Sequence, residues 1–151
     1  MAEALYTIDI LRLAASTAQW PPLAAPDGSA ERRSPTCGSR VGVDVTRDAS
    51  GSIAAIGVTV SACALGQASA AILASAAPGR DVAAIRTAQA GLAAYLRGED
   101  DRLPDWPNID TLAAARSYPA RHASILLAFD AALAALEAAA TDSQDQDRAH
   151  G

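Results

Sequence analysis

Two cysteines are the residues of this sequence with the strongest capacity for chemistry. Cys37 lies in the polar segment 35–40, directly before an alternating apolar run, and Cys63 directly follows a second such run. Gly38 permits a tight turn beside Cys37, and Arg40 places a positive charge nearby. Both features favour the thiolate, which is the form of cysteine that attacks an electrophile or binds a metal. Cys37 is therefore a candidate nucleophile or metal ligand.

The two cysteines flank a predicted β-hairpin. Residues 41–46 and 53–60 alternate apolar with small or polar side chains on either side of a turn at 48–52. An antiparallel pair returns the chain to the edge where it started, so we expect Cys37 and Cys63 to lie close together. Cys63 also opens an Ala-rich predicted helix, whose N-terminal amides stabilise a thiolate. The alternative is that each cysteine is only a small, buried apolar side chain.

His122 is the third candidate ligand. It is the single histidine outside the C-terminal tail, and it lies at the predicted start of the last helix. Two thiolates and an imidazole suit zinc or iron but lack one ligand of a closed tetrahedral site. Water, Ser39 or a group from outside the chain would complete the set. The alternative is a histidine with a surface or helix-capping role.

Composition and missing motifs exclude several classes of function. The chain has 39 Ala, 12 Arg and no Lys, and its net charge of −5 argues against a nucleic-acid-binding surface. No apolar run approaches the roughly 18 residues of a membrane span, and the acidic residues near the N-terminus do not fit a secretory signal. The sequence contains no C-x-x-C, H-E-x-x-H or Gly-rich phosphate loop. We expect a cytoplasmic protein, with no nucleic-acid or membrane partner, whose cysteines are thiols or metal ligands.

The remaining pattern predicts an α+β fold. Helices are predicted at 3–16, from Cys63 to 77, at 81–96 and at 120–139, with a short helix at 109–115 and a third strand near 30–36. Strands followed by helices indicate a small antiparallel sheet of about three strands, packed against helices on one face, with a helix-rich C-terminal half. We expect residues 1–140 to form one domain and the polar residues 141–151 to form a disordered tail.

Three short segments occur in a fixed order along the chain. The first is PTCGSR at 35–40, the second is SACALGQASAAIL around Cys63, and the third is HASIL at 122–126. They resemble, in turn, the Cys-Gly-Asp loop, the helix-opening Cys and the His-Cys-Ser-Ile-Leu segment of the NifU/IscU-type iron–sulfur cluster assembly scaffold family. The similarity covers residues 3 to about 138, including the first helix. Two departures stand out: Ser39 replaces the family's loop Asp, and Ala123 replaces its third Cys.

The resemblance implies a SufE/NifU-like fold and a scaffold or scaffold-like carrier rather than an enzyme. Its ligands for iron, a [2Fe–2S] cluster or zinc would be Cys37, Cys63 and His122, with Ser39 as a weak ligand at most. Its partners would be a cysteine desulfurase and iron–sulfur acceptor proteins, and a homodimer could supply four thiolates to one cluster. Two alternatives remain: a SufE-like persulfide acceptor that uses Cys63, and a degenerate interaction domain without metal.

Overall fold

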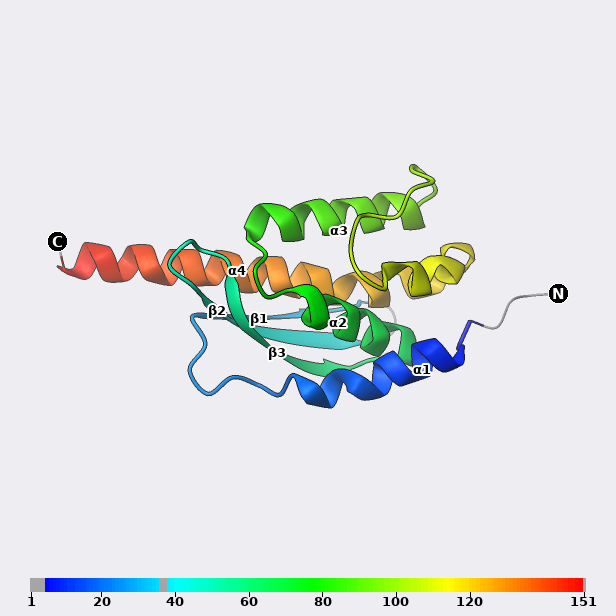
Figure 1. Cartoon of the computed structure of the whole chain (residues 1–151), viewed down its shortest axis with the longest axis horizontal. Coiled ribbons are helices and arrows are strands. Elements are labelled where there is room, and N and C mark those ends of the chain that lie inside the picture. Colours follow the sequence, from blue (N-terminus) through cyan, green and yellow to red (C-terminus); the bar gives the residue numbers. More distant parts are fainter. Residues whose placement is uncertain (1–4, 36–37, 151) are drawn as a thin grey trace.

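The computed structural model describes residues 5–35 and 38–150, and it describes side chains as far as residue 140. A three-stranded antiparallel sheet in the order β1-β2-β3 packs against helices, which confirms the α+β prediction (Figure 1). The strands are β1 (Gly28–Arg33), β2 (Arg40–Arg47) and β3 (Ile53–Ser61). The helices are α1 (Ile8–Ala15), α2 (Ala64–Ala76), α3 (Val82–Leu96) and α4 (His122–His150), with 3₁₀ segments η1 (Ser16–Gln19), η2 (Ile109–Ser117) and η3 (Pro119–Arg121).

The alternating pattern of the sequence decides which face of the sheet is buried. Val41, Val43 and Val45 of the central strand β2 are at most 1% exposed, whereas the residues between them are only partly buried. The opposite residue to Val43 on β3 is Val58, which is also buried. Side chains alternate between the two faces of a strand, so these residues share one face of the sheet. That apolar face packs against α2 and α4.

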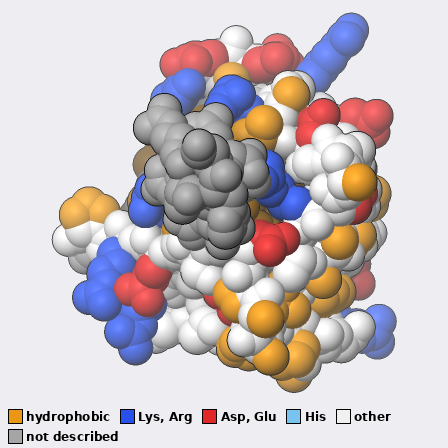
Figure 2. Space-filling view, turned by 90° about the vertical axis from the view of Figure 1, so that its left-hand side faces the viewer, with side chains coloured by type: hydrophobic (Ala, Val, Ile, Leu, Met, Phe, Trp, Pro, Cys, Tyr) orange, Lys and Arg blue, Asp and Glu red, His pale blue; other side chains and the backbone are white. Residues whose placement is uncertain are grey.

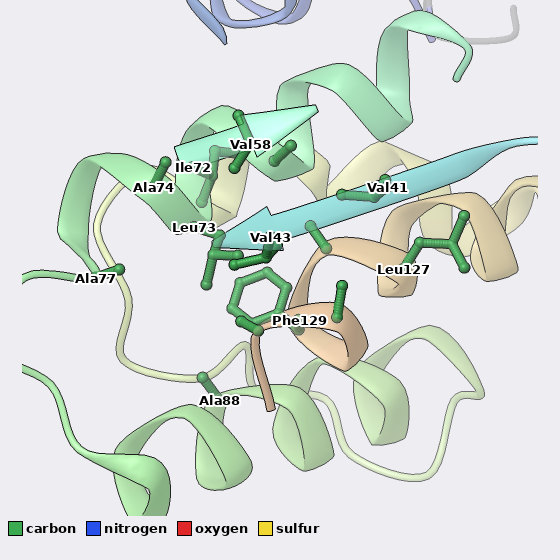
Figure 3. Close-up of a cluster of buried hydrophobic side chains, with 14 of the residues drawn as sticks. Val41, Val43, Val58, Ile72, Leu73, Ala74, Ala77, Ala88, Leu127 and Phe129 are labelled. Carbon is green, nitrogen blue, oxygen red and sulfur yellow. The ribbon is translucent and has the colours of Figure 1, made fainter. Parts of the chain in front are cut away.

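The helices form layers above this face. Helix α4 lies along β1 and β2, α2 lies beside it, α3 packs on α4, and α1 packs on α2 (Figure 1). Phe129 of α4 is fully buried and lies among side chains of β2 and α2 (Figure 3). The Trp106 ring meets Phe129 edge-on at 5.5 Å, and its indole N–H donates to the Ile72 carbonyl at 2.8 Å. One large aromatic pair therefore anchors a core that otherwise consists mainly of small and aliphatic side chains.

Helix α4 is longer than the sequence pattern predicted. It begins at His122 and continues past residue 139 to His150, through the segment that we expected to be a tail. No proline or glycine interrupts residues 120–150, so no residue type in this stretch breaks the helix. Within the described part of the chain, residues 119–140 are long and apolar enough to cross a membrane, but 56% of the apolar window is buried in the fold. That burial is typical of a core helix.

The face at the left-hand end of Figure 1 carries charged groups of both signs. Arginine and acidic side chains lie next to one another there, and apolar side chains gather on another part of the same face (Figure 2). Interspersed charges of this kind are usual for the exposed face of a globular domain. They do not make up the basic stripe typical of a nucleic-acid-binding surface.

The closeness of α4 to β1 generates a first prediction. A Cβ at Gly28 would clash with the backbone of Ala135 and Ala139, whereas a Cβ at Gly42 on the next strand would meet its nearest neighbour at 3.7 Å. We expect Gly28→Ala to lower the free energy of unfolding by about 1–3 kcal/mol, as overpacking does. Urea unfolding measures the effect, with Gly42→Ala as the control. Equal stability of the two variants would contradict it.

The contact between α3 and α4 generates a prediction on pH. Asp130 accepts a 2.9 Å hydrogen bond from the Gln89 amide, and burial raises its pKa from the ordinary 3.8 despite this bond and the nearby charge of Arg32. A carboxyl group whose pKa is raised in the folded state binds its proton more tightly there, so stability falls as the pH rises through that range. Asp130→Asn removes the ionisation and retains an acceptor oxygen. We expect this variant to have a higher urea midpoint than the wild type at pH 7, and no gain in stability over the wild type below pH 3.8.

The exposed Asp110 provides a control for this experiment, because Asp110→Asn makes the same change of charge on the surface. We expect the stability of that variant to follow the wild-type pH profile. A urea midpoint for Asp130→Asn that is equal to or below the wild-type value at pH 7 would show that burial of the ionised Asp130 carboxylate does not destabilise the fold.

Candidate functional site

The candidate site lies where the hairpin meets the starts of α2 and α4. In the observed register Arg40, the first residue of β2, is paired with Ser61, the last residue of β3. The hairpin prediction is therefore confirmed, and the loop before β2 lies beside the segment that leads into α2. Cys37 itself lies outside the described residues, so the proximity of the two thiols stays a prediction.

Cys63 occupies the N-cap position of α2. Its backbone is extended (φ −63°, ψ 168°) and its side chain makes no capping hydrogen bond to the helix. The thiol is free and partly exposed. A sulfur in this position lies next to the unpaired amides of a first helical turn, which carry a partial positive charge.

The Cys63 sulfur contacts a residue that the sequence analysis did not select. The Ser124 Oγ lies 3.6 Å from the Cys63 Sγ, and the Ser124 hydroxyl also donates to the Ser39 Oγ at 3.0 Å. Ser124 and Ser39 are 1% and 6% exposed. Ser39, predicted as a weak ligand, thus has a hydroxyl partner that connects it to Cys63. The exposed Ala123, which replaces the family's third Cys, lies directly before Ser124.

A glycine allows Ser124 to come this close to α2. A Cβ at Gly66 would lie 2.9 Å from the Ser124 Oγ and 2.8 Å from the Ala62 Cβ. Both distances are shorter than real Cβ contacts, so a side chain at position 66 would force Ser124 or Ala62 to shift. One turn further along, the Ser69 hydroxyl donates to the Ile125 carbonyl at 2.6 Å and joins the two helices. The sequence offered a partial signal, a glycine early in a predicted helix, which usually has a packing reason.

His122 makes contacts of a different kind. Its Nε2 lies 2.9 Å from the Ala115 carbonyl oxygen and 3.1 Å from that of Arg116. Both partners can only accept, so Nε2 carries a proton, and in the neutral imidazole Nδ1 then holds the lone pair that a metal would require. A histidine that ligates a metal commonly donates its other N–H to a backbone carbonyl in this way. Within the described part of the chain no hydrogen bond joins His122 to Cys63, and Ser124 is the α4 residue that contacts the sulfur.

A shallow hollow of about 300 Å³ opens beside the thiol. It is lined by Gly38, Ser39, Ser61, Ala62, Cys63 and Arg121. The cation in this hollow is Arg121, from the segment before α4, whereas Arg40 is exposed on β2 and is not among the lining residues. Arg121 was not among the candidate residues predicted from the sequence, although it lies next to His122. The hollow therefore combines a thiol, a helix N-terminus and a positive charge, an arrangement that suits an anionic sulfur species.

Cys37, one of the three predicted metal ligands, lies outside the described residues, so the structure places only two of the three. Among residues 5–35 and 38–140, no three His, Cys, Asp or Glu side chains come together as a metal site. The donors that the structure brings together are the Cys63 thiol and the hydroxyls of Ser39 and Ser124. A site formed by Cys37, Cys63 and His122 remains a prediction, because one of its two thiols is Cys37.

Comparison with known proteins shows which class of protein this chain resembles. No family model and no curated protein sequence matches the chain. Among solved structures, the N-terminal part of a nitrogen-fixing NifU-like protein from Brucella abortus is 31% identical, with a TM-score of 0.83 over 91% of this chain and 95% of that one. A scaffold protein of Fervidobacterium islandicum AW-1, described as acting in iron–sulfur cluster assembly for the SUF system, is 17% identical. Its TM-score is 0.79, over 87% of this chain and 96% of that one, and at this identity it shows the fold alone.

The fold and the thiol at the junction of hairpin and helix thus define an α+β domain of the SufE/NifU-like class. The identity and coverage of the Brucella abortus structure are specific enough to go further. The chain belongs to the NifU/IscU-type scaffold family, as the resemblance of the three segments predicted.

The contacts of His122 generate a third prediction. We expect the imidazole to hold its proton on Nε2, and expect added Zn²⁺ to shift the resonance of Nδ1 while the Nε2–H signal persists. Nitrogen-15 NMR of a His150→Ala variant measures this, because that variant leaves one imidazole in the chain. A proton on Nδ1, or loss of the Nε2–H signal with metal, would contradict it.

Proposed function

We propose that the chain is a scaffold or scaffold-like carrier for iron–sulfur clusters. The observation that carries this proposal is the 31% identity to a NifU-like protein over 91% of the chain, together with the position of Cys63. The thiol lies at the junction of the hairpin and α2, beside the loop that leads from Cys37, where a family scaffold would hold its cargo. The cluster is cargo rather than a resident cofactor, and the role is that of a carrier, not of an enzyme.

The proposed ligands are the thiolates of Cys37 and Cys63 with the Nδ1 of His122. Sulfur and imidazole donors suit iron, zinc and a [2Fe–2S] cluster. The Ser39 hydroxyl is engaged by Ser124, which supports a hydrogen-bonding role for it rather than strong ligation. With Ala at position 123, one protein ligand is missing from the set. An incomplete set holds a cluster weakly, and weak retention suits transfer to an acceptor protein.

The electrostatics of the hollow support an anionic cargo. Thiolates and sulfide bring negative charge to the site, and Arg121 lines the same hollow as Cys63. Within the described chain the Arg121 guanidinium makes no hydrogen bond or ion pair, so its charge remains available. We propose a cysteine desulfurase and iron–sulfur acceptor proteins as partners, in the cytoplasm, with a homodimer as the form that could share one cluster between two protomers.

Anaerobic reconstitution with ferrous iron and sulfide tests the proposal. We expect Cys37→Ala and Cys63→Ala to reduce bound iron and sulfide at least tenfold, and His122→Ala to increase the rate of loss to a chelator. His150→Ala is the matched control for the histidine, since it removes an imidazole from the other end of α4. Equal iron content in wild type and all three variants would show that the scaffold proposal is wrong.

Restoring the missing ligand generates a further prediction. Ala123 is exposed at the start of α4, in the position of the family's third Cys. We expect Ala123→Cys to slow the release of a reconstituted cluster to a chelator by about tenfold or more, because a third thiolate completes the set. The exposed Ala54→Cys adds a thiol on β3 and is the control. Equal release rates in the two variants would show that position 123 does not face the cluster.

A second candidate function is that of a persulfide acceptor that uses Cys63. It is favoured by the partly exposed thiol at a helix N-terminus, in a hollow lined by Arg121. The Cys63 thiolate would attack the terminal sulfur of a donor persulfide, form a new S–S bond, and release the donor cysteine as a thiolate. Mass spectrometry after incubation with a desulfurase and cysteine distinguishes the two functions. Sulfur uptake that requires Cys63 alone, without iron loading, would favour the acceptor. Absence of both iron loading and sulfur uptake in the wild type would favour an interaction domain.

A further inference from the structure

A second hollow, which we call the Arg80 hollow, lies at the other end of α2 from Cys63. The helix has 13 residues and therefore spans about 20 Å. Beyond its C-terminal end, a hollow of about 310 Å³ opens between the first two turns of α3 and the loop that carries Trp106. Its volume is at the lower end of the range for small-molecule sites. Its walls carry a cation, a carboxylate and apolar groups, from Arg80, Asp105, Ala84, Ala88, Pro104 and Trp106.

The fold fixes the Arg80 side chain. Its guanidinium carbon lies 4.5 Å from the centroid of the Trp106 ring, and its Nε donates to the Ala76 carbonyl at 3.2 Å. The ring is fixed in turn, because Trp106 is 4% exposed and its indole N–H donates to the Ile72 carbonyl. The Arg80 carbonyl accepts the Ile53 N–H at 2.8 Å, which joins this residue to β3. A guanidinium held in this way is pre-organised, so it loses little conformational freedom when it binds a ligand.

These contacts leave part of the guanidinium without a partner. They use its face and its Nε, and within the described chain the two terminal nitrogens of Arg80 make no hydrogen bond or ion pair. Covering Trp106 and binding a carbonyl at the end of α2 are both structural roles for an arginine, but neither requires a hollow beside it. The terminal N–H groups of a guanidinium match a carboxylate, which they bind through two parallel hydrogen bonds.

Asp105 gives the Arg80 hollow a second, opposite charge. It is exposed and lines the same hollow as Arg80, yet within the described residues the two side chains form no ion pair with each other. Both charges therefore remain available to a ligand. A simple anion would be attracted by Arg80 and repelled by Asp105, whereas a ligand that carries both charges is attracted by both residues. The apolar wall, formed by Ala84, Ala88 and Pro104, suits an aliphatic group.

We propose that the Arg80 hollow binds a small zwitterion, namely an α-amino acid with an aliphatic side chain. The ligand carboxylate pairs with the Arg80 guanidinium, its ammonium pairs with the Asp105 carboxylate, and its side chain lies against the apolar wall. This site is separate from Cys63 and does not depend on the proposed scaffold function. Exposed charge pairs are individually weak, so we expect a dissociation constant in the millimolar range.

Proton–nitrogen NMR of the full chain, with L-leucine as the probe, tests the proposal. The chain has two tryptophans, so the indole N–H of Trp106 monitors the Arg80 hollow, and that of Trp20, which does not line it, is the internal reference. We expect L-leucine to shift the Trp106 signal saturably and to leave the Trp20 signal in place. Isocaproate and isoamylamine retain the leucine side chain but lack the ammonium and the carboxylate, respectively. We expect each of them to bind about fivefold more weakly, because one charge pair is lost.

Substitutions assign the two charges. Arg80→Gln removes the guanidinium, and we expect it to weaken L-leucine binding by about tenfold, the size expected for losing hydrogen bonds to a charged group. Arg86→Gln is the matched control, because it makes the same change of charge on α3 outside the hollow, and we expect it to bind like the wild type. Asp105→Asn removes the attraction for the ammonium, so we expect this variant to bind L-leucine no more tightly than isocaproate.

Several results would overturn the proposal. One is a Trp106 signal that does not move with L-leucine, or that moves equally with all three probes. Another is an L-leucine affinity of Arg80→Gln equal to that of Arg86→Gln. If Arg80→Gln does not fold, Asp105→Asn decides, because Asp105 is exposed and its substitution removes no buried packing. A variant at position 105 that still prefers L-leucine to isocaproate as strongly as the wild type would refute recognition of a zwitterion.

Discussion

The close contact between the N-terminal ends of α2 and α4 is the constraint on which the site depends. Gly66 has no side chain to hold the helices apart, and the Ser69 hydroxyl of α2 donates a hydrogen bond to the Ile125 carbonyl in the first turn of α4. These two features place Ser124 against Cys63 and, through Ser124, against Ser39. Because α4 also lies on β1 and β2, the same contact sets the position of the thiol relative to the hairpin. A larger residue at position 66 would separate all three elements of the site at once.

The parts of the fold that depend on local periodicity were predictable from the sequence. The valines at 41, 43 and 45 gave the period of a half-buried strand, and the predicted helices at 63–77 and 81–96 closely match α2 and α3. The length of α4 was not predicted, because the apolar stripe fades after residue 139 although nothing breaks the helix. The third strand was predicted near 30–36, about two residues later in the sequence than β1, because β1 is mostly exposed and its polar residues show little alternation.

The site was less predictable than the fold, for a physical reason. Sequence spacing located Cys63 at a helix start and the hairpin that leads to it, since both are local features. The contact of Ser124 with Cys63 joins residues far apart in the chain, and it exists only because two helices pack closely. A serine near the start of a helix is usually explained by capping, so its residue type gave no sign of a buried role. Arg121 was missed in the same way, because its place in the hollow depends on how the segment before α4 folds back.

The high alanine content has a consequence for the chemistry as well as for packing. Ala128, Ala131, Ala132 and Ala135 of α4 are fully buried, so the helix rests on the sheet with little side-chain bulk between them. Such a helix has few ways to shift without creating clashes, and its first turn is held firmly. The proposed ligand set, which lacks one thiolate, would otherwise tolerate large movements of its remaining donors. In the proposed scaffold, rigid support from α4 would let such a site keep a defined shape while cargo leaves through ligand exchange.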